Sequence, residues 1–112
     1  MGLTTTRGRG SFTISDIDAD WTYGTDVTVD EGFPPDGMWV TSIQFLPTGV
    51  SDQLIVHDGG ADAQEVFDSG VVTSMDPVIK YFNPARHCKP VVDESDCTFS
   101  SAANAVCIVD YE

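Results

Sequence analysis

Three aspartates at alternate positions, Asp16, Asp18 and Asp20, are the first residues whose spacing could support chemistry. Oxygen ligands spaced in this way open an EF-hand calcium loop, which then needs glycine at its sixth position and glutamate at its twelfth. The chain has Trp21 and Val27 at those positions. The EF-hand pattern is therefore rejected, and a solvated acidic loop is a better interpretation than a looser oxygen-ligand site.

The histidines and cysteines are the next candidates, because both residue types bind zinc and cysteine can act as a nucleophile. Structural zinc sites usually take ligands from a Cys-x-x-Cys or His-x-x-x-His segment, and the sequence contains neither spacing. We therefore predict no metal site, and we interpret Cys97 and Cys107 as small buried hydrophobic residues. The residues considered are His57, His87, Cys88, Cys97 and Cys107.

The segment from Arg86 to Lys89 places positive charges beside the thiol of Cys88, an arrangement that lowers the pKa of a cysteine. A nucleophilic cysteine also needs an oriented base and an oxyanion site, and the sequence locates neither. A surface loop with a basic contact patch is the better interpretation. The chain also has no Gly-x-Ser-x-Gly segment and no phosphate-binding glycine loop. We predict no catalytic residue, no cofactor and no enzymatic activity.

Aromatic side chains could bind a sugar if their rings were exposed together. Trp21 and Tyr23 stand beside Gly24 and are flanked by acidic residues, so they are the candidates for such a glycan platform. Trp39 lies inside an apolar run and is predicted to belong to the core. Covering one end of the fold is the competing role for Trp21 and Tyr23, and it is favoured over the platform.

The net charge restricts the partners of the chain. Of its 112 residues, 18 are acidic and five are Lys or Arg, which gives a formal charge of −13. Such a surface repels phosphate groups and anionic lipid, so neither nucleic acid nor a membrane is a predicted partner. The few bases lie near the N-terminus or between positions 80 and 89. They are the predicted contacts to a protein partner: Arg7, Arg9, Lys80, Arg86 and Lys89.

The sequence contains neither an apolar segment of transmembrane length nor the apolar core of a secretory signal. Its three cysteines are odd in number and widely spaced. We therefore expect free thiols and synthesis in a reducing cytoplasm, rather than a disulfide framework.

These candidate residues must be positioned by short β-strands, because apolar residues alternate over brief runs that turn-forming residues separate. No stretch sustains a helical period. About seven to nine such strands are typical of an antiparallel β-sandwich with a jelly-roll-like organisation. Residues 1–10 are predicted to form a flexible N-terminal arm, and residues 11–112 a single domain. The predicted strands are Ser11–Ile17, Asp26–Asp30, Met38–Leu46, Gln53–His57, Glu65–Asp68, Val78–Phe82, Pro90–Val92, Cys97–Phe99 and Ala105–Tyr111.

The stretch from Met38 to Gly60 is the centre of this prediction. It contains two apolar runs joined by a segment rich in Pro, Gly, Ser and Asp, which predicts two neighbouring strands with a turn between them. In a regular strand every second side chain lies on the same side, and in the first run one side would carry Trp39, Ile43 and Phe45. That side is predicted to face the core. Further along, Asn83-Pro84 is predicted to end a strand.

From about Met38 to Val109, short motifs follow one another in a characteristic order. A Trp-Val-x-x-Ile-x-Phe-x-Pro strand is followed by Ser-Asp-x-Leu-Ile-Val-His-Asp-Gly, and then by Asp-Pro with Ile-Lys-Tyr-Phe. Lys-Pro-Val-Val-Asp and Ser-Asp-Cys-Thr-Phe-Ser precede the last strand. This order resembles a group of small virion proteins encoded by tailed bacteriophages.

The resemblance implies a non-enzymatic β-sandwich structural protein of the phage particle, with capsid decoration, or cement, as the favoured role. It implies binding to the major capsid protein, stabilisation of the head, and a virion location after synthesis in the host bacterial cytoplasm. An acidic body with a basic island at positions 80–89 would permit a homo-oligomer, either dimer or trimer, on the particle. The alternative is a neck, tail or fibre component with a carbohydrate-binding sandwich for host recognition.

Overall fold

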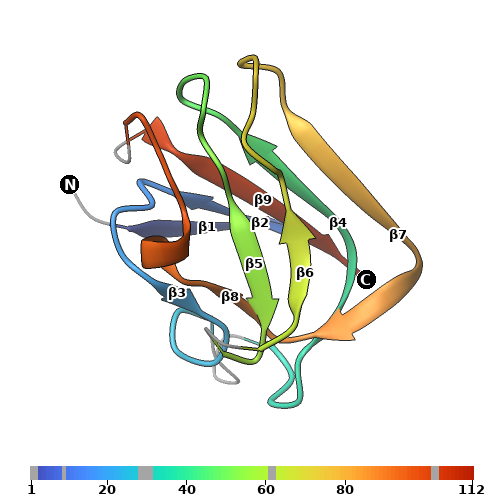
Figure 1. The fold of residues 1–112 in the computed structure, drawn as a ribbon. Coiled ribbons are helices and arrows are strands. Elements are labelled where there is room, and N and C mark those ends of the chain that lie inside the picture. Colours follow the sequence, from blue (N-terminus) through green and yellow to red (C-terminus); the bar gives the residue numbers. More distant parts are fainter. Residues whose placement is uncertain (1–2, 9, 28–31, 61–62, 102–103) are drawn as a thin grey trace.

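The computed structural model describes residues 3–8, 10–27, 32–60, 63–101 and 104–112, and these residues form an all-β fold (Figure 1). Within them the chain has nine strands and a turn of 3-10 helix at Glu94–Asp96, with no α-helix. The paired strands run antiparallel. The elements are β1 (Thr4–Gly8), β2 (Ser11–Ser15), β3 (Trp21–Thr22), β4 (Met38–Leu46), β5 (Ile55–Asp58), β6 (Glu65–Asp68), β7 (Val78–Cys88), β8 (Pro90–Val92), η2 (Glu94–Asp96) and β9 (Val106–Tyr111).

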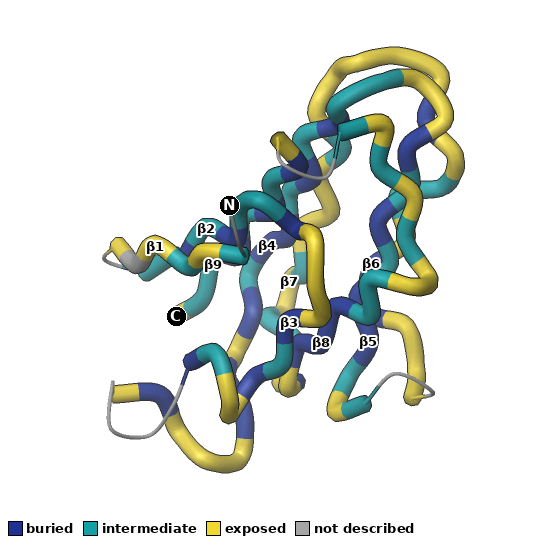
Figure 2. Tube along the Cα trace, turned by 90° about the vertical axis from the view of Figure 1, so that its left-hand side faces the viewer, coloured by how far each residue is buried: buried dark blue, intermediate teal, exposed yellow. Residues whose placement is uncertain are grey.

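Two sheets pack face to face as a β-sandwich, which confirms the predicted fold class. One sheet has five strands in the order β1-β2-β9-β4-β7, and the other has four in the order β3-β8-β5-β6. When the molecule is turned by 90°, β1, β2 and β9 lie on one side and β5 and β6 on the other (Figure 2).

The strand pairing is that of a jelly roll. β2 pairs with β9, β3 with β8, β4 with β7 and β5 with β6. The chain is therefore one long antiparallel ribbon that doubles back between β5 and β6, and successive pairs alternate between the two sheets because the ribbon rolls over on itself. β1 adds a further strand beside β2. This rolling brings strands that are far apart in the sequence, such as β2 and β9, side by side.

The core lies between the sheets and contains the inward side of each strand. Phe12 stacks on Trp21 with ring centroids 5.1 Å apart, and Phe33 meets Phe12 edge-on at 6.1 Å. Burial of every second side chain along a strand is the physical reason that alternation predicted these strands. Other fully enclosed side chains are Ile14, Ile43, Phe45, Leu54, Val56 and Cys107.

One extra residue in β4 decides which side of the sheet Trp39 occupies. The register of β4 shifts between Val40 and Ser42 against both of its neighbours, which makes Thr41 a β-bulge. As a result Val40 and Ile43 both point inward, and Trp39 is 52% exposed. The prediction that Trp39 belongs to the core is wrong, because strict alternation does not continue across a bulge.

β7 is longer than predicted because it continues through Asn83-Pro84. Tyr81 and Arg86 are five positions apart in β7, but they pair with Ser42 and Val40, which are two positions apart in β4. The strand therefore bulges away from β4 between Tyr81 and Arg86. Proline is tolerated here, since β7 is the edge strand of its sheet and a bulged residue makes no ladder hydrogen bond. The prediction that Asn83-Pro84 ends the strand is wrong, and Arg86–Cys88 is strand rather than surface loop.

β4 and β5 do not form the predicted hairpin. β4 belongs to the five-stranded sheet and β5 to the four-stranded sheet, so the connection Pro47–Asp52 crosses from one layer to the other. Two apolar runs joined by a turn-rich segment are common to a hairpin and to such a crossing, and only long-range pairing separates them. The bounds predicted for Met38–Leu46 and Glu65–Asp68 are those observed for β4 and β6.

The N-terminal segment is a strand where the structure describes it. Thr4–Gly8 forms β1 and pairs along its length with β2. Nε1 of the buried Trp21 donates a 2.8 Å hydrogen bond to Oγ1 of Thr5, so β1 also satisfies a polar atom of the core. The prediction of a flexible arm over residues 1–10 is therefore wrong for Thr4–Gly8. A strand rich in threonine and glycine has little apolar alternation to reveal it.

Two of the predicted short strands are reduced to single bridges. For Asp26–Asp30, residues 28–30 lie outside the described residues, and Val27 makes an isolated bridge to Tyr23. Within Cys97–Phe99, Thr98 makes an isolated bridge to Gln53.

Candidate binding surfaces

The side of the five-stranded sheet that faces away from the core is the first candidate surface. The registers and the alternation of buried residues place one set of side chains from β2, β4, β7 and β9 on this side. We call this set the outer sheet face. Its residues are Ser11, Thr13, Ser15, Trp39, Ser42, Gln44, Leu46, Ile79, Tyr81, His87, Val106, Ile108 and Asp110.

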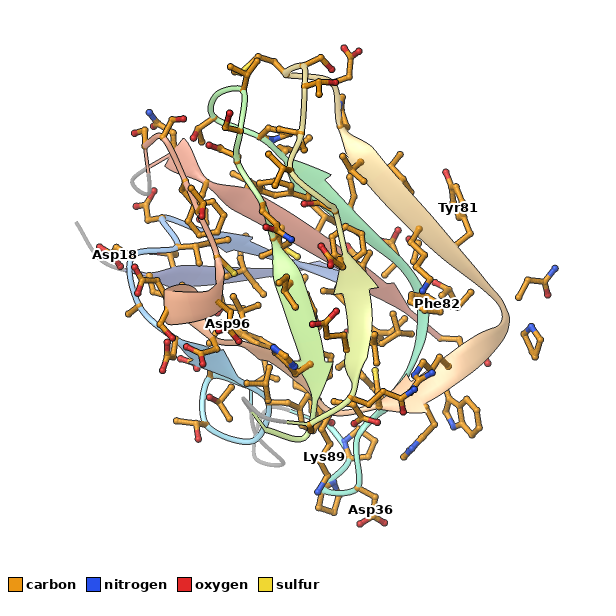
Figure 3. All side chains as sticks on the ribbon, viewed as in Figure 1. Asp18, Asp36, Tyr81, Phe82, Lys89 and Asp96 are labelled. Atoms are coloured by element: carbon orange, nitrogen blue, oxygen red, sulfur yellow. The ribbon has the colours of Figure 1, made fainter. Side chains whose placement is uncertain are left out.

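The outer sheet face carries little charge, although the whole chain has a net charge of −13. Asp110 is its single carboxylate, and the hydroxyl of Ser42 donates a 2.7 Å hydrogen bond to it. Acids such as Asp18 and Asp96 lie on segments outside this sheet (Figure 3). Charged residues are depleted at the centres of protein interfaces, because a charge must be desolvated when it is covered. The low charge of this face is therefore a property that it shares with protein contact surfaces.

Three large side chains project from the outer sheet face. Trp39 is 52% exposed, Ile79 43% and Tyr81 74%. Tyr81 points away from the body of the molecule, whereas Phe82 lies on the other side of β7 (Figure 3). β7 also forms one edge of the five-stranded sheet. Exposed apolar groups beside a sheet edge favour contact with another polypeptide, either across the face or by strand addition.

A cavity of about 390 Å³ is the second candidate surface, and it lies where the start of β4 meets the end of β7 and the end of β9. We call it the Trp39 pocket. Phe33, Met38 and Tyr111 supply apolar lining, and the rings of Trp39 and His87 meet edge to face with centroids 4.9 Å apart. The volume is within the range of small-ligand sites.

The loop before β4 forms one wall of the Trp39 pocket, and glycine is required to place it. Gly37 has a φ of +111°, and a Cβ added there would lie 2.7 Å from the carbonyl oxygen of Cys88. Glycine alone accepts both this conformation and this approach. The hydroxyl of Tyr23 donates to the carbonyl oxygen of Pro34, which holds the loop from the core side. The wall is therefore fixed by contacts within the protein.

The charged side chains that line the Trp39 pocket are both carboxylates. Asp36 and Glu112 are exposed at its rim, and no lysine or arginine is among its described lining residues. The backbone N–H of Glu112 donates a 3.0 Å hydrogen bond to the carbonyl oxygen of Trp39, which fixes this end of the chain beside β4. Lys89 runs close to Gly37, 3.2 Å from the position of an added Cβ, but does not line the cavity.

The candidate glycan platform of Trp21 and Tyr23, which ranked below a role in covering the fold, is wrong. Trp21 is fully enclosed and Tyr23 is 7% exposed, so neither ring is available to a sugar. Burial, together with the nearby Tyr111, also raises the pKa of Tyr23. Both side chains belong to the core cluster. The aromatic residue that reasoning from the sequence missed is Trp39, and the polar pair Thr41-Ser42 inside an apolar run was the available signal of the bulge that turns it outward.

Two of the predicted basic contacts are used within the protein. Nζ of Lys80 donates to the carbonyl oxygen of Val66 at 3.3 Å and lies 5.1 Å from the centroid of the Phe82 ring. Nη2 of Arg86 donates to Oε1 of Gln64 at 3.2 Å. These contacts tie β7 to the β6 side of the four-stranded sheet.

The other basic residues are placed as follows. Lys89 is exposed, and its backbone N–H donates to Oδ1 of Asp58 at 2.9 Å. Arg7 lies in β1 opposite Phe12, with its side chain outside the described atoms, and Arg9 lies outside the described residues. A role for the five bases in binding a partner stays a prediction.

The three cysteines are free thiols, as predicted. Burial raises the pKa of Cys88 and of Cys97 to about 11, and that of Cys107 to about 12. For Cys88 the nearby Asp58 adds to this effect, and the lowering by Arg86 is outweighed. Because the thiolate is the nucleophilic form, the basic neighbourhood does not activate Cys88 at neutral pH.

Asp52 is a fully buried carboxylate with a structural role. Its oxygens accept hydrogen bonds from the backbone and hydroxyl of Thr48 at 2.8 and 2.7 Å, and from those of Ser100 at 2.7 and 2.9 Å. The backbone N–H of Gly49 donates a further bond at 3.2 Å. Burial by itself raises the pKa of Asp52, but these hydrogen bonds outweigh it and lower the pKa below its ordinary value. We call this arrangement the Asp52 clamp, since it joins the β4–β5 connection to the segment before β9.

His57 is a second buried polar residue, and it faces two acceptors. Nδ1 lies 2.9 Å from the carbonyl oxygen of Ala63, and Nε2 lies 3.2 Å from Oδ2 of Asp96. Burial by itself lowers the pKa of His57, but these two bonds and the charges of Asp96 and Glu65 raise it above its ordinary value. Imidazolium donates from both ring nitrogens, so this surrounding suits the charged form.

The acidic triplet has contacts of its own. The backbone N–H of Asp18 donates to the carbonyl oxygen of Asp16 at 2.7 Å, and Oδ1 of Asp20 accepts from the backbone of Glu94 at 2.9 Å. Among the residues that the structure describes, no group of three or more His, Cys, Asp or Glu side chains could hold a metal ion. The described part of the chain also contains no helix that is long and apolar enough to cross a membrane.

Comparison with family models, with curated proteins and with solved structures finds no match to this chain. Any function must therefore be inferred from the outer sheet face and the Trp39 pocket.

Proposed function

We propose that this chain is a non-enzymatic structural protein of a tailed-bacteriophage particle, and specifically a capsid decoration protein that binds the major capsid protein and stabilises the head. The observation that carries the proposal is the outer sheet face, which is almost uncharged in a chain of net charge −13 and exposes Trp39, Ile79 and Tyr81. Such a face can be covered by another protein at little cost in desolvation. The motif order between Met38 and Val109 directs the proposal to the phage particle.

The jelly-roll pairing supports the proposal by fold analogy, since viral capsid domains share this architecture. Lectin domains share it too, and a carbohydrate-binding neck, tail or fibre protein was the alternative. That alternative depended on Trp21 and Tyr23, which are buried, so it loses the residues that supported it.

The proposal includes association of several copies, as a dimer or trimer, on the particle. Chains of net charge −13 repel one another over most of their surface. Contacts between copies, like contacts with the capsid, must then use surface where charge is low. The outer sheet face meets this condition.

Binding to phage heads tests the proposal. Purified protein is added to heads that lack it, and the bound copies per head are measured together with survival of the heads after heating or osmotic shock. We expect saturable binding in proportion to the number of capsid subunits, and greater survival. Absence of binding, or binding without any gain in survival, would overturn the decoration role.

A pair of variants tests whether the outer sheet face is the surface used. The double substitution Ile79→Ser with Tyr81→Ser removes exposed apolar groups, and we expect binding to heads to weaken by about tenfold or more. Val71→Ser is the matched control, because Val71 is 63% exposed but lies in the connection between β6 and β7. Equal binding by both variants would exclude this face as the capsid contact.

A further inference from the structure

We infer that the Trp39 pocket binds the guanidinium group of an arginine side chain presented by another polypeptide. Three features of the pocket support this ligand: a half-exposed tryptophan, an apolar lining, and carboxylates as its charged groups. The inference does not depend on the identity of the particle, and the pocket shares Trp39 and His87 with the outer sheet face.

The exposed indole supplies the flat surface. Trp39 is 52% exposed even though its ring meets His87 at 4.9 Å, and it is one of the residues that line the cavity. Tryptophan attracts a cation above its ring more strongly than tyrosine or phenylalanine does. Phe33 and Met38 continue the apolar surface inward, which suits the methylene stem of a long basic side chain.

The carboxylates of the pocket favour a ligand with positive charge. Asp36 and Glu112 line the pocket, and the rest of the chain adds to a negative field, because the net charge is −13. A field of one sign concentrates ligands of the opposite sign in a cleft and repels the same sign. A neutral sugar could stack on Trp39 but would gain nothing from this field. The electrostatics therefore favour a cation over a saccharide.

Guanidinium fits this lining better than ammonium does. It is planar, so it can stack on an indole, and it presents several N–H donors that match a carboxylate in pairs. Ammonium is a compact and strongly hydrated charge that cannot stack. The combination of a flat aromatic ring with carboxylates at the rim of the same cavity is thus specific for arginine among the basic side chains.

Titration with small probes tests the inference on the purified chain. N-acetyl-arginine methylamide is added while tryptophan fluorescence is followed, with the citrulline analogue as a neutral probe of the same shape. We expect a saturable change with a dissociation constant of about 1 mM, as befits a single side chain. The lysine analogue and the citrulline analogue should each bind about tenfold more weakly or not at all. Added salt should weaken the binding of the arginine analogue.

Three variants locate the signal. Trp39→Phe leaves the enclosed Trp21 as the fluorophore, and the response should disappear while the melting temperature stays close to that of the parent chain. The substitutions Asp36→Asn and Glu112→Gln preserve the shape of the side chain but remove its charge. Each should weaken the binding of the arginine analogue by about threefold to tenfold. Asp18→Asn is the matched control on an exposed acid that does not line the cavity, and it should leave binding unchanged.

Several results would overturn the inference: no saturable response, equal binding of the citrulline analogue, tighter binding of a methyl glycoside, or a response that persists in Trp39→Phe. Each of these leaves the binding of intact protein to phage heads as a separate measurement. Failure of the pocket and failure of the capsid proposal are therefore distinguishable.

Discussion

The connections at the two ends of β4 each contain an aspartate, and the two aspartates differ in burial and in hydrogen bonding. Beyond its last residue, Asp52 is fully buried and every hydrogen bond around it comes from the protein itself. Before its first residue, Asp36 is exposed at the rim of a cavity beside Trp39. A buried charge with a full set of donors holds the fold together, whereas an exposed charge beside an open aromatic ring is available to a ligand. The same strand therefore joins a structural end to a binding end.

Of the two ends of β4, the structural end should show the larger loss of stability on substitution. Asp52→Asn keeps the shape of the side chain but turns an amide group toward backbone and hydroxyl donors, which leaves several of them unpaired in the interior. We expect a loss of about 3 kcal/mol in the free energy of unfolding. Urea denaturation followed by circular dichroism measures this. Asp36→Asn is the control at the binding end and should change stability by less than about 0.5 kcal/mol. Equal losses of unfolding free energy in the two variants would contradict the assignment of different roles to Asp52 and Asp36.

Acid should act on the same carboxylate. The pKa of Asp52 is lowered in the folded state, so the stability from its charge is complete above the unfolded pKa of about 4. This stability is lost as the pH falls through the folded value, because the unfolded chain then binds the proton more readily. Unfolding free energies measured from pH 6 down to pH 2 should fall less steeply in Asp52→Asn than in the parent chain. Parallel curves would contradict this assignment.

Gly49 sharpens the comparison by testing how closely the clamp is packed. A Cβ at Gly49 would lie 2.4 Å from Oγ of Ser100 and 2.8 Å from its Cβ, so Gly49→Ala must displace a residue of the Asp52 clamp. We expect a loss of about 1–3 kcal/mol. Gly60→Ala is the matched control, since a Cβ there meets nothing within 4 Å. Thermal melts of both variants measure the difference, and a Gly49→Ala protein as stable as the control would show that the connection is loose.

His57 should give a smaller effect with the opposite pH dependence. Its pKa is raised in the folded state, so the stability from its charged form is complete below the unfolded pKa of about 6.5 and is lost as the pH rises through the folded value. We expect the protein to be more stable at pH 6 than at pH 8.5 by at most about 1 kcal/mol. His57→Gln should abolish this difference in denaturation experiments. A greater stability at pH 8.5 in the parent chain would show that burial, not the bond to Asp96, dominates.

Trp39 at the binding end should matter least for stability. Because Trp39 is half exposed, Trp39→Ala should cost less than about 1 kcal/mol, whereas Trp21→Ala should cost about 3–5 kcal/mol by emptying the core. Chemical denaturation of the two variants measures both values. A large loss in Trp39→Ala would mean that the outer sheet face is part of the core of the molecule rather than a contact surface.

The difference between the two tryptophans shows where prediction from sequence stopped. Trp21 stands among acids and glycine, the usual surroundings of an exposed loop, yet the jelly roll encloses it and β1 supplies a partner for its Nε1. Trp39 stands in an apolar run, yet the bulge at Thr41 turns it outward. Both assignments depended on neighbours in the sequence, whereas burial was decided by strands that lie far away along the chain.

The sequence by itself determined the class of fold, the positions of strands such as Met38–Leu46, the negative charge and the free thiols. These properties follow from composition and from local alternation, which each strand displays without reference to any other. Only the tertiary structure decided that Pro47–Asp52 crosses between sheets, that Thr4–Gly8 is a strand, and that Trp39 opens onto a pocket. Those outcomes depend on register and on one bulged residue, and a shift of one position in a strand exchanges its two faces.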